Sequence, residues 1–204
     1  MKNYKKITYN GRPMGTSQKE FGELRRSDEV KGNSKELQRR MQEDGYLFIP
    51  GLLGRANVKA ASISTAKRLA EFGYLAEGSS LEKCIAAPDG DPSPVITTKE
   101  HLHFAIDENP EINHMIFGDL LMGTFKLFLN GEPIYLKNLS RFRTNFPRTP
   151  AVNVHCDAPY MGRGTQFIYT TWVPLGDINF EQGGLMILEH SHNHKALTSY
   201  RQSD

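Results

Sequence analysis

A histidine and an aspartate separated by one residue, His155 and Asp157, are the residues best suited to chemistry in this chain of 204 residues. In extended backbone successive side chains point to opposite faces, so these two would share a face, with Cα atoms roughly 6 to 7 Å apart. A neutral imidazole nitrogen and an anionic carboxylate oxygen suit a divalent first-row metal ion. With a second histidine they would form the facial triad of ligands that leaves coordination positions open on Fe(II).

The spacing alone is weak support for a metal site. The seven His and nine Asp of the chain would produce about 0.3 such pairs by chance. A histidine at the end of a strand that hydrogen-bonds a nearby aspartate, with no metal, stays open as an alternative at this point. The residues around the pair must therefore decide between the two interpretations.

Apolar residues at helical spacing predict three helices ahead of the pair. The first begins at Ser34, a plausible N-cap, and ends at Gly45. The second covers about 55–72. The third begins at Pro110, which is a favourable first-turn residue, and ends near Asn130.

Strand-forming residues dominate the chain after the third helix. Because helices come first and strands follow, the order predicts an α+β fold in which helices pack on an antiparallel sheet. The long loop 77–98 has the size of a substrate-facing lid, and the polar residues 1–33 predict a loosely packed arm ahead of one domain at 34–204. The predicted strands are 46–49, 134–142, 152–155, 166–173 and 185–188.

Three segments resemble, in order and spacing, the phytanoyl-CoA dioxygenase family of Fe(II)- and 2-oxoglutarate-dependent oxygenases. They are 155–160 (HCDAPY), 171–177 (TWVPLGD) and 181–192 (EQGGLMILEHSH). Residues 43–53 (EDGYLFIPGLL) are similar to the family's N-terminal segment, in which a helix ends at Asp-Gly and leads into the first strand. The likeness is strongest over about 150–192.

The resemblance implies a double-stranded β-helix, a cupin-like jelly roll, with the N-terminal helices packed on one sheet. It implies that His155 and Asp157 bind Fe(II), and that 2-oxoglutarate and O₂ are cosubstrates. The reaction it implies is hydroxylation of a small organic molecule, with decarboxylation of 2-oxoglutarate to succinate. By position Trp172 would border the 2-oxoglutarate pocket, packing its indole on the carbon chain of the cosubstrate.

Arg141 is the candidate for binding the cosubstrate through a basic side chain. Lys137 and Arg143 lie an even number of residues from Arg141 on the predicted strand, so the three side chains share one face. At least one of the three could therefore face the pocket. A solvated strand face is the alternative for each of them.

The chain departs from the family's pattern at its C-terminal end. In the family the second metal-binding histidine and the residue that binds the far carboxylate of 2-oxoglutarate lie on strands beyond the Gly-Gly-Leu stretch. We therefore expect a C-terminally truncated member that lacks the last strands, with the third ligand beyond residue 204. His190, His192 and His194 would offer another metal site if their segment were extended. The family's turn at this position instead predicts a structural role for His192.

Composition and charge exclude several classes of protein. The 25 Lys+Arg and 23 Asp+Glu leave a net charge of +2, too balanced to indicate nucleic-acid binding. A mean hydropathy of -0.50, with no signal-like or membrane-spanning run, predicts a cytoplasmic protein without a membrane partner. The distant cysteines Cys84 and Cys156 fit either one disulfide or two free thiols, and a reducing compartment is the default.

Two other functions stay open on the sequence alone. One is a cupin-like metal protein without oxygenase activity that uses His155 with the 190–194 cluster. The other is a non-catalytic jelly-roll interaction domain that lacks a complete metal site. The residues identify neither the small-molecule substrate nor the oligomeric state.

Overall fold

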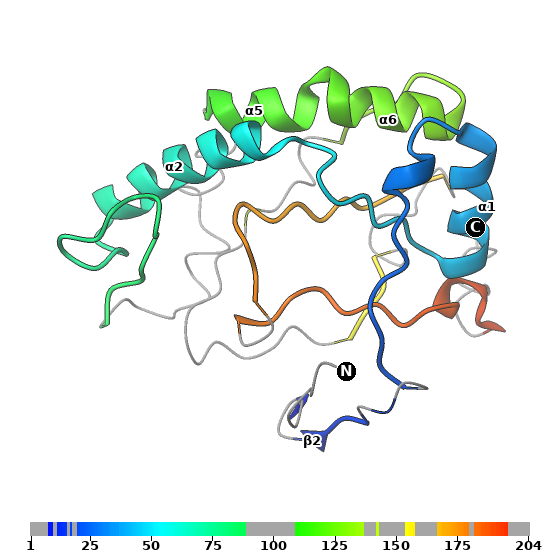
Figure 1. The fold of residues 1–204 in the computed structure, drawn as a ribbon, viewed down its shortest axis with the longest axis horizontal. Coiled ribbons are helices and arrows are strands. Elements are labelled where there is room, and N and C mark those ends of the chain that lie inside the picture. The colour runs from blue at the N-terminus through cyan, green and yellow to red at the C-terminus, as the bar shows by residue number, and fades with distance from the viewer. Residues whose placement is uncertain are drawn as a thin grey trace.

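One layer of the molecule consists of the helices at 55–71, 110–117 and 119–129. The segments that carry the candidate site, 154–157 and 167–179, pass beneath this layer (Figure 1). The computed structural model describes residues 8–9, 12–15, 17, 20–88, 109–136, 142, 154–157, 167–179 and 182–195. Its strands are β1 (Thr8–Tyr9) and β2 (Arg12–Pro13), which pair antiparallel. Its helices are η1 (Asp28–Val30), α1 (Ser34–Asp44), α2 (Arg55–Glu71), α5 (Pro110–Phe117), α6 (Asp119–Leu129) and η4 (Ser191–Asn193).

Helix α1 lies at the end of the layer, against α6. Its N-cap is Asn33 and not Ser34, which corrects the prediction by one residue. Asn33 has extended backbone, and its side-chain oxygen accepts a hydrogen bond from the backbone N–H of Glu36 at 3.2 Å, whereas Ser34 is already helical. At the other end Gly45 adopts the left-handed conformation, with φ at 82°, as expected for a residue just past a helix.

The residues just ahead of α1 are packed against it. Arg26 forms a parallel bridge with Phe48, and the backbone N–H of Ser27 donates to the Phe48 carbonyl oxygen at 2.7 Å. Arg40 of α1, itself buried, donates to the Arg26 carbonyl oxygen at 2.5 Å. Ser27 is only 1% exposed, because these hydrogen bonds hold its segment between α1 and the chain that follows it.

The guanidinium groups of Arg39 and Arg40 hydrogen-bond the Glu36 carboxylate and lower its pKa from 4.5 to about 2. Above pH 4.5 the carboxylate is ionised in both the folded and the unfolded chain, so its full stabilising effect is present. As the pH falls from 4.5 to 2 the unfolded chain takes up the proton first, and the stabilising effect is lost. Glu36→Gln should therefore weaken the acid-induced fall of the urea midpoint, measured by circular dichroism between pH 6 and pH 3.

Glu77→Gln, at an exposed position, is the matched control for this experiment. It should leave the acid-induced fall as in the unchanged chain. An equal fall in the unchanged chain and in Glu36→Gln would contradict the ion pairs of α1.

The remaining helices follow their predicted bounds, with one break. Helix α2 ends within one residue of the prediction, and Pro110 is the first residue of α5. The single helix predicted over 110–129 is corrected to two, because Gly118 leaves the helical region at ψ 163°. A Cβ at Gly118 would collide with the His114 carbonyl oxygen, so only glycine fits the approach between the two helices. Asn130 ends α6 in the left-handed conformation.

The core lies between the helix layer and the segments beneath it. Ala61 of α2 and Ile112 and Met115 of α5 form its centre. Val173 and Leu175 pack against this centre from the segment below. The other partly buried apolar residues packed against this centre are Leu53, Val58, Ile116 and Phe142.

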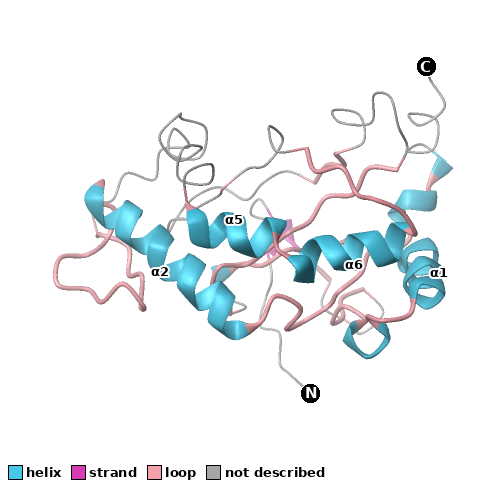
Figure 2. Cartoon of the chain, turned by 90° about the horizontal axis from the view of Figure 1, so that it is seen from above, coloured by secondary structure: helices cyan, strands magenta, loops and turns pink. Residues whose placement is uncertain are grey.

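The predicted strands are not paired into ladders in the part of the chain that the structure describes. Residues 134–136, 154–155, 167–173 and 185–188 are loops there (Figure 2). The predicted strand 46–49 is reduced to the single bridge at Phe48, whose side chain is exposed, while Tyr46 is buried. A strand requires a neighbour in register for its hydrogen bonds. The jelly roll therefore stays a prediction.

Two further features concern the membrane and redox expectations. Of the helices within the described ranges, none combines the length and the apolar character needed to cross a bilayer. Cys84 and Cys156 are free thiols.

Candidate metal site

His155 and Asp157 lie close together at the surface of the molecule. The Nε2 atom of His155 is 3.5 Å from Oδ1 of Asp157. The side chains are 44% and 36% exposed, so neither donor atom is sealed inside the core. The pair therefore presents a nitrogen and an oxygen donor on two partly exposed side chains.

The second carboxylate oxygen of Asp157 has a partner that the sequence did not reveal. The hydroxyl of Thr170 donates a hydrogen bond to Oδ2 at 2.7 Å. This contact joins two described segments that are 13 residues apart in sequence. It leaves Oδ1 on the side of His155, so the two oxygens of the carboxylate have different neighbours.

Packed side chains on both sides of Thr170 leave it at the exposed face of its segment. Tyr169 packs edge-on against Phe128 of α6, with ring centroids 5.0 Å apart. Val173 and Leu175 pack against the helix core, whereas the side chains at 170, 172 and 174 are exposed. Positions 169, 173 and 175 therefore face the helices, while Thr170 belongs to the exposed stretch 170–172.

Trp172 shares the exposed side of this segment with Thr170 and is 49% exposed. Arg141, the predicted cosubstrate-binding residue, lies outside the described residues. The neighbouring Phe142 is described and packs against the helix core.

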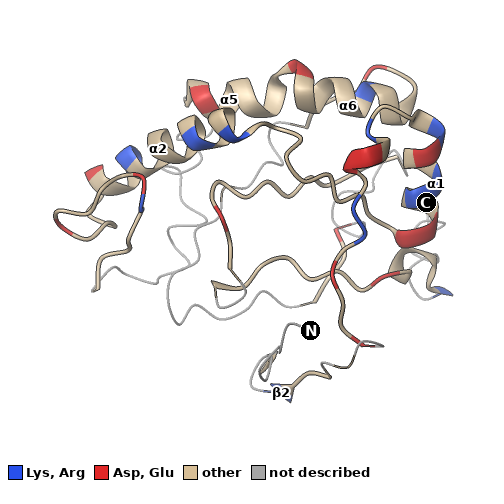
Figure 3. Cartoon of the chain, in the orientation of Figure 1, with Lys and Arg blue, Asp and Glu red and all other residues tan. Residues whose placement is uncertain are grey.

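Charged side chains are sparse in the described segments that follow the His155 and Asp157 pair. The described segments 167–179 and 182–188 contain no Lys or Arg and are drawn almost entirely in the neutral colour in Figure 3. Acidic and basic residues instead alternate along α1, in agreement with its ion pairs. A basic partner for a carboxylate ligand must therefore come from another part of the chain.

His190 and His192 hydrogen-bond the carbonyl groups at the C-terminal end of α1. Nδ1 of His190 lies 2.7 Å from the Glu43 carbonyl oxygen, and Nε2 of His192 lies 2.9 Å from the Gln42 carbonyl oxygen. The backbone N–H of His190 donates to the Asp44 carbonyl oxygen at 3.4 Å. The last carbonyl groups of a helix have no partner within the helix, so these histidines satisfy them. The predicted structural role of His192 agrees with this contact.

A hydrogen-bonded tyrosine strengthens the same junction. The hydroxyl of Tyr46 donates to Glu189 Oε1 at 2.7 Å and accepts from the backbone N–H of Arg25 at 2.9 Å. Burial, as the largest cause, raises the pKa of Tyr46 above its usual value. The segment around η4 is therefore bound directly to the chain that follows α1 and, through Tyr46, to the chain that precedes it.

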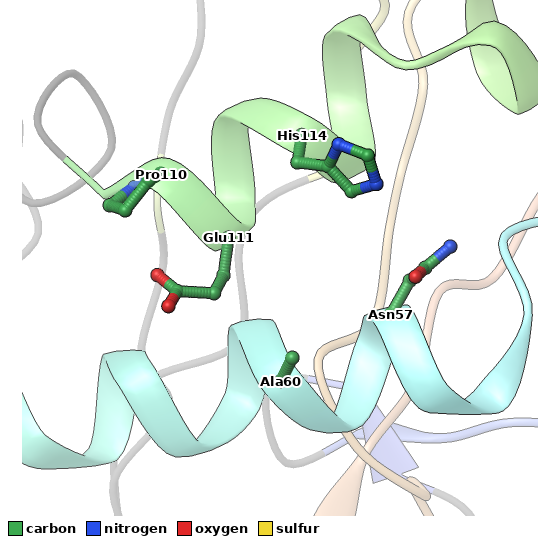
Figure 4. Close-up of a pocket in the computed structure, with 5 residues that line it drawn as sticks. All are labelled: Asn57, Ala60, Pro110, Glu111 and His114. Atoms are coloured by element: carbon green, nitrogen blue, oxygen red, sulfur yellow. The ribbon is translucent and has the colours of Figure 1, made fainter.

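A separate cavity of about 200 Å³ lies between α2 and α5 (Figure 4). Glu111 and His114 of α5 face Asn57 of α2 across it. The Glu111 carboxylate accepts a hydrogen bond from Ser64 at 3.1 Å. Neither His155 nor Asp157 lines this cavity, which is bounded by Asn57, Ala60, Pro110, Glu111 and His114.

Comparisons with known proteins give one distant relative. No model of a known protein family matches the chain, and no solved structure matches it. The chain is 26% identical over 167 residues to 1-deoxypentalenic acid 11-beta-hydroxylase of Streptomyces arenae. The match covers 76% of this chain and 53% of that protein, so the chain spans about half the length of its curated relative. The chain is thus similar to a protein named as a hydroxylase.

Proposed function

We propose that this chain is part of an Fe(II)- and 2-oxoglutarate-dependent dioxygenase that hydroxylates a small organic molecule. The similarity to a hydroxylase supports an oxidative reaction. The observation that carries the finer assignment is the His155 and Asp157 pair, whose donor atoms are 3.5 Å apart at an exposed surface.

His155 and Asp157 supply two of the donors that a first-row metal ion requires, while the described residues contain no group of three His, Cys, Asp or Glu side chains that could hold an ion. Two donor atoms that each lie about 2.1 Å from one ion are about 3.0 Å apart at a right angle and about 3.4 Å apart at the tetrahedral angle. The observed separation is close to these values, so only a small side-chain movement is needed to bind one ion. A facial triad requires one more histidine, which the proposal places outside the described residues.

The chain's own residues would then have distinct tasks. His155 supplies a neutral nitrogen and Asp157 an anionic oxygen, and Thr170 holds the other oxygen of that carboxylate. Iron(II) bound there would supply open coordination positions for 2-oxoglutarate and O₂. Trp172 would pack on the carbon chain of the cosubstrate, and Arg141 would face the cosubstrate pocket with its basic side chain.

Exposed apolar side chains support the jelly-roll core as part of this proposal. Val154, Phe167 and Leu188 lie in predicted strands, yet they are 78%, 69% and 74% exposed. Apolar residues on two facing sheets bury one another in a jelly roll, so a second sheet over these segments would remove this exposure. The helices above 167–175 would then cover the outside of one sheet.

The substrate class follows from the relative and from the site. The name of the relative says that it acts on 1-deoxypentalenic acid. The described part of the site is rich in apolar residues and holds no basic side chain at 167–179 or 182–188. Both observations favour a small, largely apolar organic molecule as the substrate.

An anaerobic titration of the purified full-length protein with Fe(II), followed by 2-oxoglutarate and O₂, tests the proposal. We expect one Fe(II) bound per chain and succinate formed from 2-oxoglutarate. Metal bound without succinate would overturn the oxygenase assignment in favour of a cupin-like metal protein. Absence of metal binding would overturn it in favour of an interaction domain.

A further inference from the structure

We propose that Thr170 is a positioning residue for the metal-binding carboxylate, and that its hydroxyl directs a single oxygen of Asp157 to the ion. This inference rests on the proposed function. It goes beyond it because it assigns a role to a residue outside the set of metal ligands.

The geometry divides the two carboxylate oxygens. Thr170 donates to Oδ2 at 2.7 Å, a well-formed distance for a hydroxyl donor. His155 Nε2 faces the other oxygen, Oδ1, at 3.5 Å. With Oδ2 held by the hydroxyl, Asp157 binds the ion through Oδ1 alone, and one more coordination position stays open for other ligands.

The fold fixes the direction of the hydroxyl. Tyr169 on one side of Thr170 is packed against Phe128, and Val173 is packed against the helix core. These contacts leave Thr170 on the opposite face of the segment, toward Asp157. A threonine is branched at Cβ, so its χ1 angle has few allowed values and its hydroxyl is well oriented.

Loss of the hydroxyl would free the carboxylate to rotate. The terminal torsion of an aspartate has a broad distribution, so no intrinsic preference would keep Oδ1 toward His155. The carboxylate would then reach a bound ion with both oxygens or pair with the imidazole. Mutation of groups that orient metal ligands in this way lowers metal affinity by about 10- to 100-fold.

The test compares Fe(II) affinity among single variants by anaerobic competition with a chelator. Thr170→Val keeps the shape of the side chain and removes the hydroxyl, so it should weaken Fe(II) binding by about 10- to 100-fold. Thr170→Ser restores the donor and should bind within a few-fold of the unchanged chain. Thr171→Val, at the exposed neighbouring position, is the matched control and should bind as the unchanged chain does.

The urea midpoint separates positioning from folding. Because Thr170 is exposed, Thr170→Val should leave the midpoint nearly unchanged while the metal affinity falls. If Thr170→Val unfolds, Thr170→Ala replaces it in the same comparison. An unchanged chain that binds Fe(II) and a Thr170→Val variant that binds it equally well would overturn this inference and leave the proposed function standing. An unchanged chain that binds no Fe(II) would overturn both.

Discussion

Asp157→Asn is expected to lower the affinity of the chain for Fe(II) by about 100-fold or more, the largest functional effect that the structure predicts. Asparagine has nearly the same shape, so its carbonyl oxygen still accepts the hydrogen bond from Thr170. It removes the negative charge that the ion requires of this ligand. The affinity is measured by anaerobic titration of the purified variant, with succinate formation as the second readout.

Asp177→Asn is the matched control for this prediction. Asp177 lies in the same described segment as Thr170, its side chain is 97% exposed, and its nearest ionic partner is Arg55 at 3.9 Å. Its replacement should leave Fe(II) affinity unchanged. Equal affinities of Asp157→Asn and the unchanged chain would exclude Asp157 as a ligand and, with it, the oxygenase assignment.

Gly45→Ala is expected to destabilise the fold by about 2 to 5 kcal/mol, the largest effect on stability. Gly45 has φ at 82°, where a Cβ costs about 1 to 2 kcal/mol. The new methyl group would also collide with the His192 ring, whose Cε1 atom lies 2.9 Å from the Cβ position. Forcing the ring away from the Gln42 carbonyl oxygen adds about 1 to 3 kcal/mol. Urea unfolding followed by circular dichroism measures the loss.

Gly73→Ala isolates the backbone contribution. Gly73 follows α2 with φ at 73°, but open space surrounds the position of its Cβ. Its replacement should cost only the backbone strain, about 1 to 2 kcal/mol. The double variant Gly45→Ala with His192→Ala should recover part of the loss, because the collision is removed. Equal losses for Gly45→Ala and Gly73→Ala would show that the His192 ring does not pack against Gly45.

The helices could be predicted from the sequence because their signals are local. Pro110 and Asn130 mark the two outer ends of the α5 and α6 pair through their own backbone preferences. The break at Gly118 was missed because apolar residues continue at helical spacing on both sides of it. The N-cap was misplaced by one residue because Asn33 and Ser34 are both good caps, and only the backbone conformation selects between them.

The candidate site was predictable only in its short-range part. His155 and Asp157 are two positions apart, so backbone period alone predicts that they meet. The contact of Thr170 with Asp157 depends on how two separate segments align, which no local pattern encodes. One signal was present in the sequence: Thr170 is two residues from Trp172, so in extended backbone the two side chains would lie on one face. The docking of His190 on α1 is equally non-local, since its partner is 147 residues away.

That separation has a consequence during synthesis on the ribosome. The carbonyl groups at the end of α1 are made first, and the imidazoles that satisfy them follow about 147 residues later. At about 5 to 20 residues per second, a nascent chain waits roughly 7 to 30 s for these partners. Water must solvate the helix end for this whole interval, because the imidazoles that satisfy its last carbonyl groups have not yet been made.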